Sequence, residues 1–412
     1  MNCYSERRKK VFDLLPDHSI LMITSGTAPY KQGDAKYPFF VNRNFFYLTG
    51  LERENMTLVM LKEGKRQAES VFIEPYNELL AKWVGGRMMP DQVKEISGIQ
   101  TVDFVENLKD TVGSYLNWYG NEEMSIYSDF DQHEYAKTTD SMNHFINKVK
   151  EKYPWVTVKN ATKILTTLRM VKEPCETEDM KKAIHVTNLG IQSMWEHVHP
   201  GINESELQGW FELELYKNQC EDSFDAIVAG GHHATVLHYG DNNSVVNDNE
   251  MVLIDLGAAY HHYCADISRT FPANGTFTKR QKEIYNIVLG ANKHIIEYAK
   301  CGMTLRDLND ETIRYYEEHL PATGLLEKGT VHDYYFHSVS HMLGLETHDV
   351  SLMNTPLQPG HVFTVEPGLY IAEEGIGIRI EDDVLMTEDG AVNLSAEIMK
   401  EVEDIERFIQ KR

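Results

Sequence analysis

Two acidic residues lie inside a segment that otherwise reads as buried strands. Asp255 and Asp266 stand in MVLIDLGAAYHHYCADISRTF (251–271), where 251–256 is an apolar run typical of a buried strand and 263–271 alternates. If the two strands form a hairpin that turns at Tyr260 and His261, the carboxylates face each other about 5 Å apart at Cβ. Like charges at that distance repel unless they share a proton or hold a cation. The pair is therefore either a structural acidic pair or, the interpretation we favour, a pair of metal ligands.

A second acidic pair follows the same design in FTVEPGLYIAEEGIGIRIEDDVLM (363–386). With a hairpin centred between Glu373 and Glu374, beside a turn-favouring glycine, Glu366 and Glu381 oppose each other. The proline after Glu366 removes a ladder donor beside that carboxylate, which stability alone does not favour. Four inward carboxylates predict a site for two divalent cations.

A histidine cluster supplies nitrogen ligands for such a site. His337 stands before SVSHMLGLETHD (338–349), which contains His341 and His348. A single histidine here is more often a satisfied core residue, but the two carboxylate pairs make a ligand the better interpretation. A nitrogen ligand favours Mn²⁺, Co²⁺, Zn²⁺ or Fe²⁺ over Mg²⁺ or Ca²⁺.

The amino-acid composition argues against some classes of binding partner. The 412 residues include 63 acidic and 40 basic side chains, a formal charge of −23, which argues against nucleic acid and anionic membrane as partners. No stretch reaches the roughly 18 apolar residues of a membrane span. The start, MNCYSERRKKVFDLL, is charged where a secretory signal would be apolar. The five cysteines are scattered without CxxC spacing, so we expect reduced thiols and a cytoplasmic protein.

The elements indicate two domains, 1–159 and 160–412, in an α/β (α+β) fold. In the first we expect strands at 19–24, 57–61, 70–73 and 125–128 and helices at 90–96 and 131–150, with no cluster suited to chemistry. Trp83 in KWVGGRM is read as a packed loop aromatic, with an exposed contact near a ligand as the alternative. In the second, helices at 176–198 and 204–217 precede strands within 226–271, and helices at 279–300 and 305–320 precede strands within 362–386. This repeated order predicts an internal duplication.

The ordered blocks IDLG, CADISRTF, SHMLGLETHD, VEPGLY and IRIEDD resemble the pita-bread metallopeptidases, which include aminopeptidase P, prolidase and methionine aminopeptidase. The resemblance spans the second half of the chain and implies a pita-bread fold with an internal pseudo-two-fold axis. It also implies five metal ligands: Asp255, Asp266, His341, Glu366 and Glu381. All five are present, which argues against the creatine amidinohydrolase branch, because that branch uses the fold without metals.

Further matches imply residues around the metals. His238 in VLHYGDN, together with His337 and His348, resembles the substrate-facing histidines of the family, and Arg379 in GIRIEDD matches an arginine near the metals. The first domain, with FFYLTGL and WVGGRM, resembles the aminopeptidase P and prolidase branch. Ser338 departs from the pattern, since many relatives have glycine there.

The activity that the resemblance implies is release of the amino-terminal residue from a peptide with proline in second position, through attack by a hydroxide bridging two metals. Glu366 would shuttle the proton, His348 or His238 would stabilise the oxyanion, and Arg379 would orient Glu366 or a ligand. The alternative for Arg379 is a surface ion pair.

Three other functions stay open: an Xaa-Pro dipeptidase, a non-catalytic binding protein of this fold, and a phosphatase-type dimetal enzyme, which scarce basic groups disfavour. We expect two Mn²⁺ ions, with Co²⁺, Zn²⁺ or Fe²⁺ as alternatives, a peptide with an N-terminal Xaa-Pro as partner, and a homo-oligomer, either dimer or tetramer.

Overall fold

The computed structural model describes residues 3–118, 124–130, 141–327 and 329–411. The chain forms two compact units, residues 1–169 and 170–412. This division lies ten residues after the expected boundary at 159/160, because helix α7 (Thr162–Met170) is grouped with the first unit up to Arg169.

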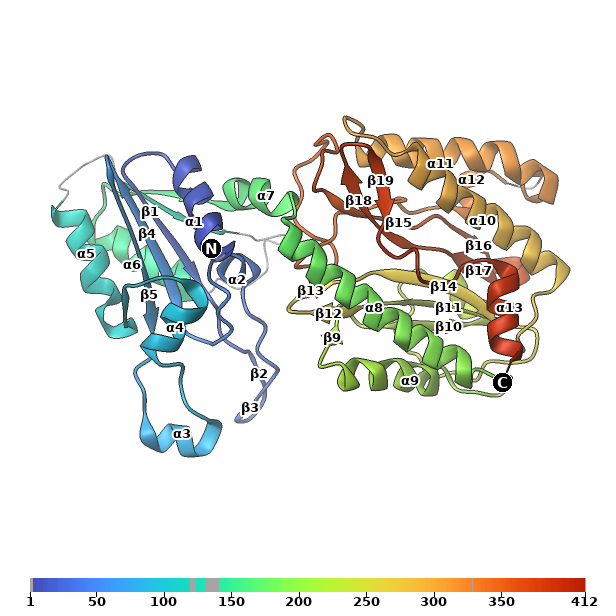
Figure 1. Ribbon diagram of the computed structural model, residues 1–412, viewed down its shortest axis with the longest axis horizontal. Helices are drawn as coiled ribbons and strands as arrows, with labels where there is room; N and C mark the ends of the chain where they lie inside the picture. The colour runs from blue at the N-terminus through green and yellow to red at the C-terminus, as the bar shows by residue number, and fades with distance from the viewer. Residues whose placement is uncertain (1–2, 119–123, 131–140, 328, 412) are drawn as a thin grey trace. The chain divides into compact units, whose positions relative to one another are not determined.

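The first unit contains a mixed six-stranded sheet (Figure 1). Its strands, in order across the sheet, are β6 (Val102–Phe104), β5 (Arg66–Ile73), β4 (Thr57–Glu63), β1 (Ser19–Thr24), β7 (Ser125–Ser128) and β8 (Thr157–Asn160). Its other helices are α1 (Cys3–Leu14), α2 (Arg43–Thr49), α4 (Pro90–Ser97), α5 (Leu108–Trp118) and α6 (Ser141–Lys152). The strands expected at 19–24 and 125–128 have those bounds, whereas the other two predicted strands are longer. Part of the helix expected at 131–150 lies outside the described residues, and the described part begins at Ser141.

Strand β1 lies inside this sheet and is buried at all six positions, as its apolar sequence SILMIT requires. Val112 of α5 and Ile146 of α6 belong to the same core cluster as Ile20 and Met22 of β1. This cluster consists of apolar side chains.

Two short elements of the first unit, the hairpin β2 (Tyr30–Gln32) and β3 (Ala35–Lys36) and the helix α3 (Glu78–Val84), carry exposed side chains (Figure 1). Trp83 on α3 is 80% exposed, and no residue of that helix is buried. The interpretation of Trp83 as a packed loop aromatic is therefore wrong, because α3 presents its apolar residues to solvent within this unit.

The second unit repeats one order of elements twice (Figure 1). The first half consists of α8 (Pro174–His197), α9 (Glu204–Lys217), β9 (Glu221–Asp222), β10 (Ile227–Gly230), β11 (Met251–Leu256), β12 (Ala258–Tyr260), β13 (Tyr263–Cys264) and β14 (Ile267–Pro272). The second half consists of α10 (Lys279–Tyr298), α11 (Leu305–His319), α12 (Val331–Tyr334), β15 (Val362–Val365), β16 (Gly368–Ile371), β17 (Ile376–Arg379), β18 (Asp382–Thr387), β19 (Gly390–Asn393) and α13 (Val402–Gln410). The predicted duplication and the pita-bread architecture are confirmed.

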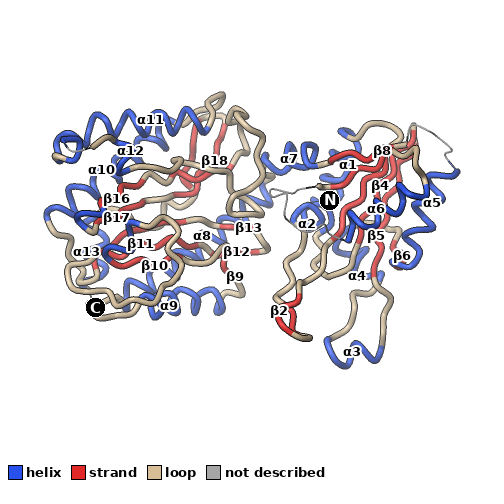
Figure 2. Tube along the Cα trace, turned by 180° about the vertical axis from the view of Figure 1, so that it is seen from behind, coloured by secondary structure: helices blue, strands red, loops and turns tan. Residues whose placement is uncertain are grey.

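Long helices cover the strands of this unit on the side shown in Figure 1, and Figure 2 shows from behind the strands β10, β11, β16 and β17 at its centre. Trp195 of α8 is completely buried and packs edge-on against Phe271 of β14, with ring centroids 6.0 Å apart. On α10, Ile284, Val288 and Ile295 are buried at the spacing of one helical face. The buried faces of these helices thus pack against the strands and stabilise them. Among the described residues, none of the helices combines the length and the apolarity needed to span a bilayer.

The first acidic hairpin has a different register from the expected one. Strand pairing places Asp255 opposite Ser268, because the turn is His261–His262, whose φ angles are 47° and 66°. Two successive residues with positive φ form the tight turn of a two-residue hairpin. Asp266 therefore does not oppose Asp255, as predicted, but continues the pattern opposite Gly257, which has no side chain.

The glycine at 257 is required by the fold. A Cβ atom there would lie 1.9 Å from the carbonyl oxygen of Ala265, so no side chain fits. Moving the turn by one residue shifts the register by two, which keeps Asp255 and Asp266 on the same face of the hairpin. The predicted neighbourhood of the two carboxylates survives although their direct opposition does not.

The second acidic hairpin has the predicted register. Val365 pairs with Asp382 on one side of the two glutamates, and Gly368 pairs with Arg379 on the other. Glu366 and Glu381 therefore oppose each other in the gap between two ladders. The turn contains the predicted Gly375, at φ 61°.

His361, next to β15, is an unusual core residue. It is completely buried, and neither of its ring nitrogens has a hydrogen-bond partner. Burial, helped by the positive charge of Lys172, lowers its pKa to about 4. The folded protein therefore holds His361 neutral at neutral pH.

We predict that His361→Leu makes stability less sensitive to acid. In the unfolded chain the histidine titrates near 6.5. Between pH 6.5 and 4 the unfolded state binds the extra proton, so stability falls as pH falls. From pH 7.5 to 5, the metal-free wild type should lose about 2 kcal/mol more than the variant, which urea unfolding measures. Parallel pH curves would show that the imidazole finds a partner in the core.

Candidate metal centre

Three side chains of the second unit offer ligand atoms to one point. One atom each from Asp266, His341 and Glu381 lies within 4.8 Å of the others. Asp266 lies between β13 and β14, His341 before β15, and Glu381 between β17 and β18. His341 Nε2 is 3.3 Å from a carboxylate oxygen of Asp266. Two carboxylates and an imidazole form a donor set that suits one divalent transition-metal ion.

Hydrogen bonding fixes the orientation of His341. Its Nδ1 lies 3.1 Å from the carbonyl oxygen of Met342, so this nitrogen donates and Nε2 is the nitrogen that faces the carboxylates. Nε2 faces Asp266 and also Glu366, at 3.6 Å from the latter. A backbone acceptor on the other ring nitrogen is the usual support of a metal-binding histidine.

Charge and burial show that Asp255 and Glu366 belong to the same site. Burial, followed by the negative charge of Asp255, raises the pKa of Asp266 well above its usual range. Burial likewise raises the pKa of Glu381, with Asp266 and Glu366 as further causes. It raises the pKa of Glu366 to about 7. Without a cation, burial favours the protonated forms of Asp266 and Glu381, so the donor set fits divalent ions that would replace those protons.

Arg379 is the buried counter-charge of this group. Its Nη2 lies 2.6 Å from the carboxylate of Asp255, and its Nε donates to the hydroxyl of Ser268 at 2.7 Å. Only 3% of Arg379 is exposed, so the alternative of a surface ion pair is wrong. Arg379 orients Asp255 directly and reaches Glu381 through Ser268.

Ser268 was not predicted. Its Oγ lies 3.1 Å from Asp255 Oδ1 and 2.7 Å from Glu381 Oε2, so its single proton is shared between the two carboxylates. Its position two residues after Asp266 put it on the same strand face, which was the only signal that sequence offered.

His337 is tied to Arg379 through Tyr370, another residue that was missed. Arg379 Nη1 donates to the Tyr370 hydroxyl at 3.0 Å, and this hydroxyl donates to His337 Nε2 at 2.9 Å. His337 Nδ1 in turn donates to the carbonyl of Ser338 at 2.8 Å. Burial, with Arg379 next, lowers the pKa of His337 to about 4. Its imidazole is therefore neutral with both nitrogens used.

His348 and His238 lie on the exposed side of the group. The ring of His348 is 4.3 Å from that of His341, and burial, with the charges of His341 and His238, lowers its pKa. The segment that carries His238 is held by Glu204, whose buried carboxylate accepts from the backbone of Gly230 and Ser244 at 2.8 and 2.9 Å. Glu204 was also not predicted.

The first unit contains one other group of possible ligands among the described residues: Asp17, His18 and Glu63. These side chains are already paired. His18 Nδ1 contacts Glu63 at 2.8 Å, and Asp17 accepts the backbone N–H groups of His18 and Gly64. An ion-pair cluster at the surface explains them.

Each of the two units matches the model of a known protein family. Residues 178–388 match the metallopeptidase family M24, and residues 4–127 match the aminopeptidase P N-terminal domain. The Xaa-Pro aminopeptidase of Haemophilus influenzae is 33% identical over 432 residues, which cover 98% of this chain and 96% of that protein.

Solved structures give the same result. A Bacillus anthracis structure provisionally assigned to aminopeptidase P has 40% identity and a TM-score of 0.96, covering 100% of this chain and 99% of the other. Aminopeptidase P of Escherichia coli with the inhibitor Pro-Leu has 28% identity and a TM-score of 0.90, with 100% and 99% coverage. This chain belongs to metallopeptidase family M24 and carries the aminopeptidase P N-terminal domain ahead of its metallopeptidase unit.

Proposed function

We propose that this chain is a metal-dependent aminopeptidase that releases the first residue of peptides with proline in second position. The observation that carries the proposal is the convergence of Asp266, His341 and Glu381 in a buried acidic site. Similarity to Xaa-Pro aminopeptidases along 98% of the chain supplies the substrate class.

The five residues that would hold two divalent ions are Asp255, Asp266, His341, Glu366 and Glu381. Bound there, such ions lower the pKa of a water molecule and polarise a carbonyl group. We propose Mn²⁺, with Co²⁺, Zn²⁺ and Fe²⁺ as alternatives, because the set is rich in carboxylates with one imidazole.

Glu366 is the proposed proton carrier. It receives the proton of the attacking water and delivers it to the proline nitrogen as the peptide bond breaks. Burial raises its pKa to about 7, so it exchanges a proton readily at neutral pH. Its carboxylate lies between His341 on one side and His337, 3.7 Å away, on the other.

His348 and His238 are the proposed donors to the substrate carbonyl. His348 is neutral at neutral pH because its pKa is lowered, so it donates an N–H without adding a charge to the site. Both ring nitrogens of His337 already have hydrogen-bond partners. We therefore propose that His337 contributes to substrate binding indirectly, by holding Tyr370 in place.

We further propose a cytoplasmic homo-oligomer, a dimer or a tetramer. Leu79, Trp83 and Val84 on α3 are each at least 69% exposed, which supports assembly through this helix. The five free cysteines support a reducing compartment.

The metal requirement predicts a thermal shift. Saturation at one hundred times Kd stabilises a protein by about 2.7 kcal/mol per site, or roughly 5–10 °C here. Mn²⁺ added to the metal-free protein should raise Tm by this order in calorimetry. In Glu381→Gln the shift should shrink, while the metal-free form should melt no lower than the metal-free wild type, because the neutral amide resembles the protonated carboxyl group that burial favours. Equal wild-type Tm values with and without metal would contradict the account.

Substrate length separates the main alternatives. We expect hydrolysis of Xaa-Pro-Xaa tripeptides and longer peptides that stops on chelation and returns with Mn²⁺ or Co²⁺, and no hydrolysis of matched Xaa-Ala-Xaa peptides. Cleavage confined to Xaa-Pro dipeptides would identify a dipeptidase instead. Equal activity of chelated and metal-loaded protein would exclude a metallopeptidase, and a metal-loaded protein without activity would favour a binding role.

The proton-carrier role predicts the effect of Glu366→Gln. Loss of a general acid–base group lowers kcat by about 10²–10⁴-fold, and glutamine keeps an oxygen that still binds metal. Metal analysis of the same sample separates lost proton transfer from lost metal. Glu373→Gln on the turn of the same hairpin is the matched control and should keep wild-type kcat. A fully metallated Glu366→Gln protein with undiminished kcat would remove Glu366 from this role.

A further inference from the structure

One buried amide contacts the backbone just before both glutamates of the second hairpin. Asn292 lies on α10 and is completely buried. Its Nδ2 donates to the carbonyl oxygen of Val365 at 3.1 Å and to that of Ile380 at 3.2 Å. Val365 precedes Glu366, and Ile380 precedes Glu381. The two hydrogens of one amide therefore connect the two strands at the residues that directly precede the glutamates.

The strands need such a donor because their own pairing is interrupted there. The backbone N–H of Glu366 donates to Val339, and that of Glu381 donates to Ser268, at 2.9 and 3.1 Å. Neither glutamate N–H bonds the opposite strand, and Pro367 has none to give. Beside the two glutamates one long cross-strand bond remains, from the N–H of Ile380 to the carbonyl oxygen of Pro367 at 3.3 Å, so the separation of the glutamates also depends on groups outside the hairpin.

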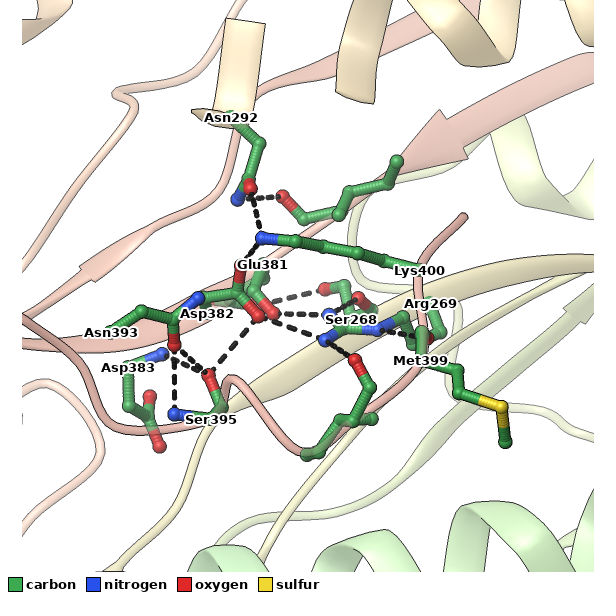
Figure 3. A network of polar contacts seen from close by, with 12 residues as sticks. Ser268, Arg269, Asn292, Glu381, Asp382, Asp383, Asn393, Ser395, Met399 and Lys400 are labelled. Atoms are coloured by element: carbon green, nitrogen blue, oxygen red, sulfur yellow. Dashed lines mark hydrogen bonds and ion pairs between the residues drawn. The ribbon is translucent and has the colours of Figure 1, made fainter. Parts of the chain in front are cut away.

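A charged network holds Asn292 in place (Figure 3). Its Oδ1 accepts from Lys400 Nζ at 2.7 Å, and Lys400 also pairs with Asp382. Asp382 pairs with Arg269 at 2.8 Å, and both side chains are fully buried. Asparagine is a poor helix former, and a buried amide is costly unless its bonds are made. Here every hydrogen-bonding atom of the amide is used.

The same network reaches the first hairpin. Arg269 Nη1 donates to the carbonyl oxygens of Ser268 and Glu381, at 2.9 and 2.6 Å. Figure 3 shows Arg269, Asp382 and Lys400 as one connected group, with Asn292 at its far end. The backbone beside Glu381 is thus fixed from two sides, by Arg269 and by Asn292.

We propose that Asn292, held by Lys400, is a positioning residue that sets the separation of Glu366 and Glu381 and through it the affinity and coordination geometry of the bound ions. Asn292 contacts neither glutamate side chain and acts through their backbone. The inference rests on the proposed function only in that these carboxylates bind divalent ions.

Two variants test the proposal with Co²⁺ as the probe. Asn292→Asp keeps the shape of the side chain and the acceptor for Lys400 but loses both N–H donors. Asn292→Leu removes the donors and the acceptor at similar size. Thr312→Val is the matched control, because it removes one buried hydrogen bond, to the carbonyl oxygen of Leu308 at 2.9 Å, on helix α11.

Calorimetric titration of metal-free protein gives the Co²⁺ affinity, and visible absorption of the Co²⁺ form reports coordination geometry. We expect both Asn292 variants to bind Co²⁺ about 10–100-fold more weakly, the range seen when a supporting partner of a metal ligand is removed, and to show altered absorption bands. Thr312→Val should lower Tm and leave the Co²⁺ affinity and the absorption bands unchanged.

Wild-type Co²⁺ affinity and absorption bands in Asn292→Asp would overturn the positioning role, whatever its Tm. If Asn292→Leu does not fold, Asn292→Asp alone decides. A wild-type protein that binds no Co²⁺ would overturn the proposed function together with this inference. Binding by the wild type that is unchanged in the variant would overturn the inference alone.

Discussion

Repulsion between like charges is the constraint on which the second unit depends. Asp255, Asp266, Glu366 and Glu381 converge in a site that is largely withdrawn from water. Two unit charges 4 Å apart repel by about 4 kcal/mol at an effective dielectric of 20. A few such pairs equal the whole stability of a typical domain, about 5–15 kcal/mol. One arginine, Arg379, does not balance four carboxylates, so protons or cations must supply the remaining positive charge.

The duplicated fold stabilises the four carboxylates by providing hydrogen-bond partners for the backbone of the residues that carry them. Each half contributes a hairpin with two carboxylates, and three of the four lie where strand pairing is interrupted. The N–H of Asp266 donates to Asp383 and that of Glu381 to Ser268, so the two halves are joined at the ligands themselves. Bonds of this kind fix the carboxylates more closely than side-chain packing alone would, because the backbone has fewer free torsions.

Sequence predicted which carboxylates lie together better than it predicted the residues that support them. The second hairpin was placed correctly because Gly375 marks a turn that needs positive φ. The first was misplaced because its turn consists of His261 and His262, which carry none of the usual turn signals. The error changed the partner of Asp255 but not its face, since side chains alternate with a period of two.

The supporting residues escaped prediction for a different reason. Ser268, Tyr370, Asn292 and Glu204 act through hydrogen bonds to residues far away in the chain, and sequence does not show which distant atom a polar side chain meets. Asn292 reaches carbonyls 73 and 88 residues away. Trp83 was predicted to be packed but is exposed, because the sequence around an aromatic residue beside glycines does not show whether the rest of its unit covers it.

The four carboxylates differ in their exposure to solvent. Glu381 and Asp266 are buried, at 2% and 4% exposed. Glu366 opposes Glu381 in the same hairpin, yet its side chain remains 16% exposed. Asp255 is half-buried too, but the guanidinium of Arg379 occupies one of its oxygens. Of the four, only Glu366 combines access to water with a pKa near neutrality and no cationic side chain within 3 Å. The two hairpins therefore place ligands of one chemical type in unequal surroundings, and that inequality supports the proposed role of Glu366 as proton carrier in addition to its proposed role as a metal ligand.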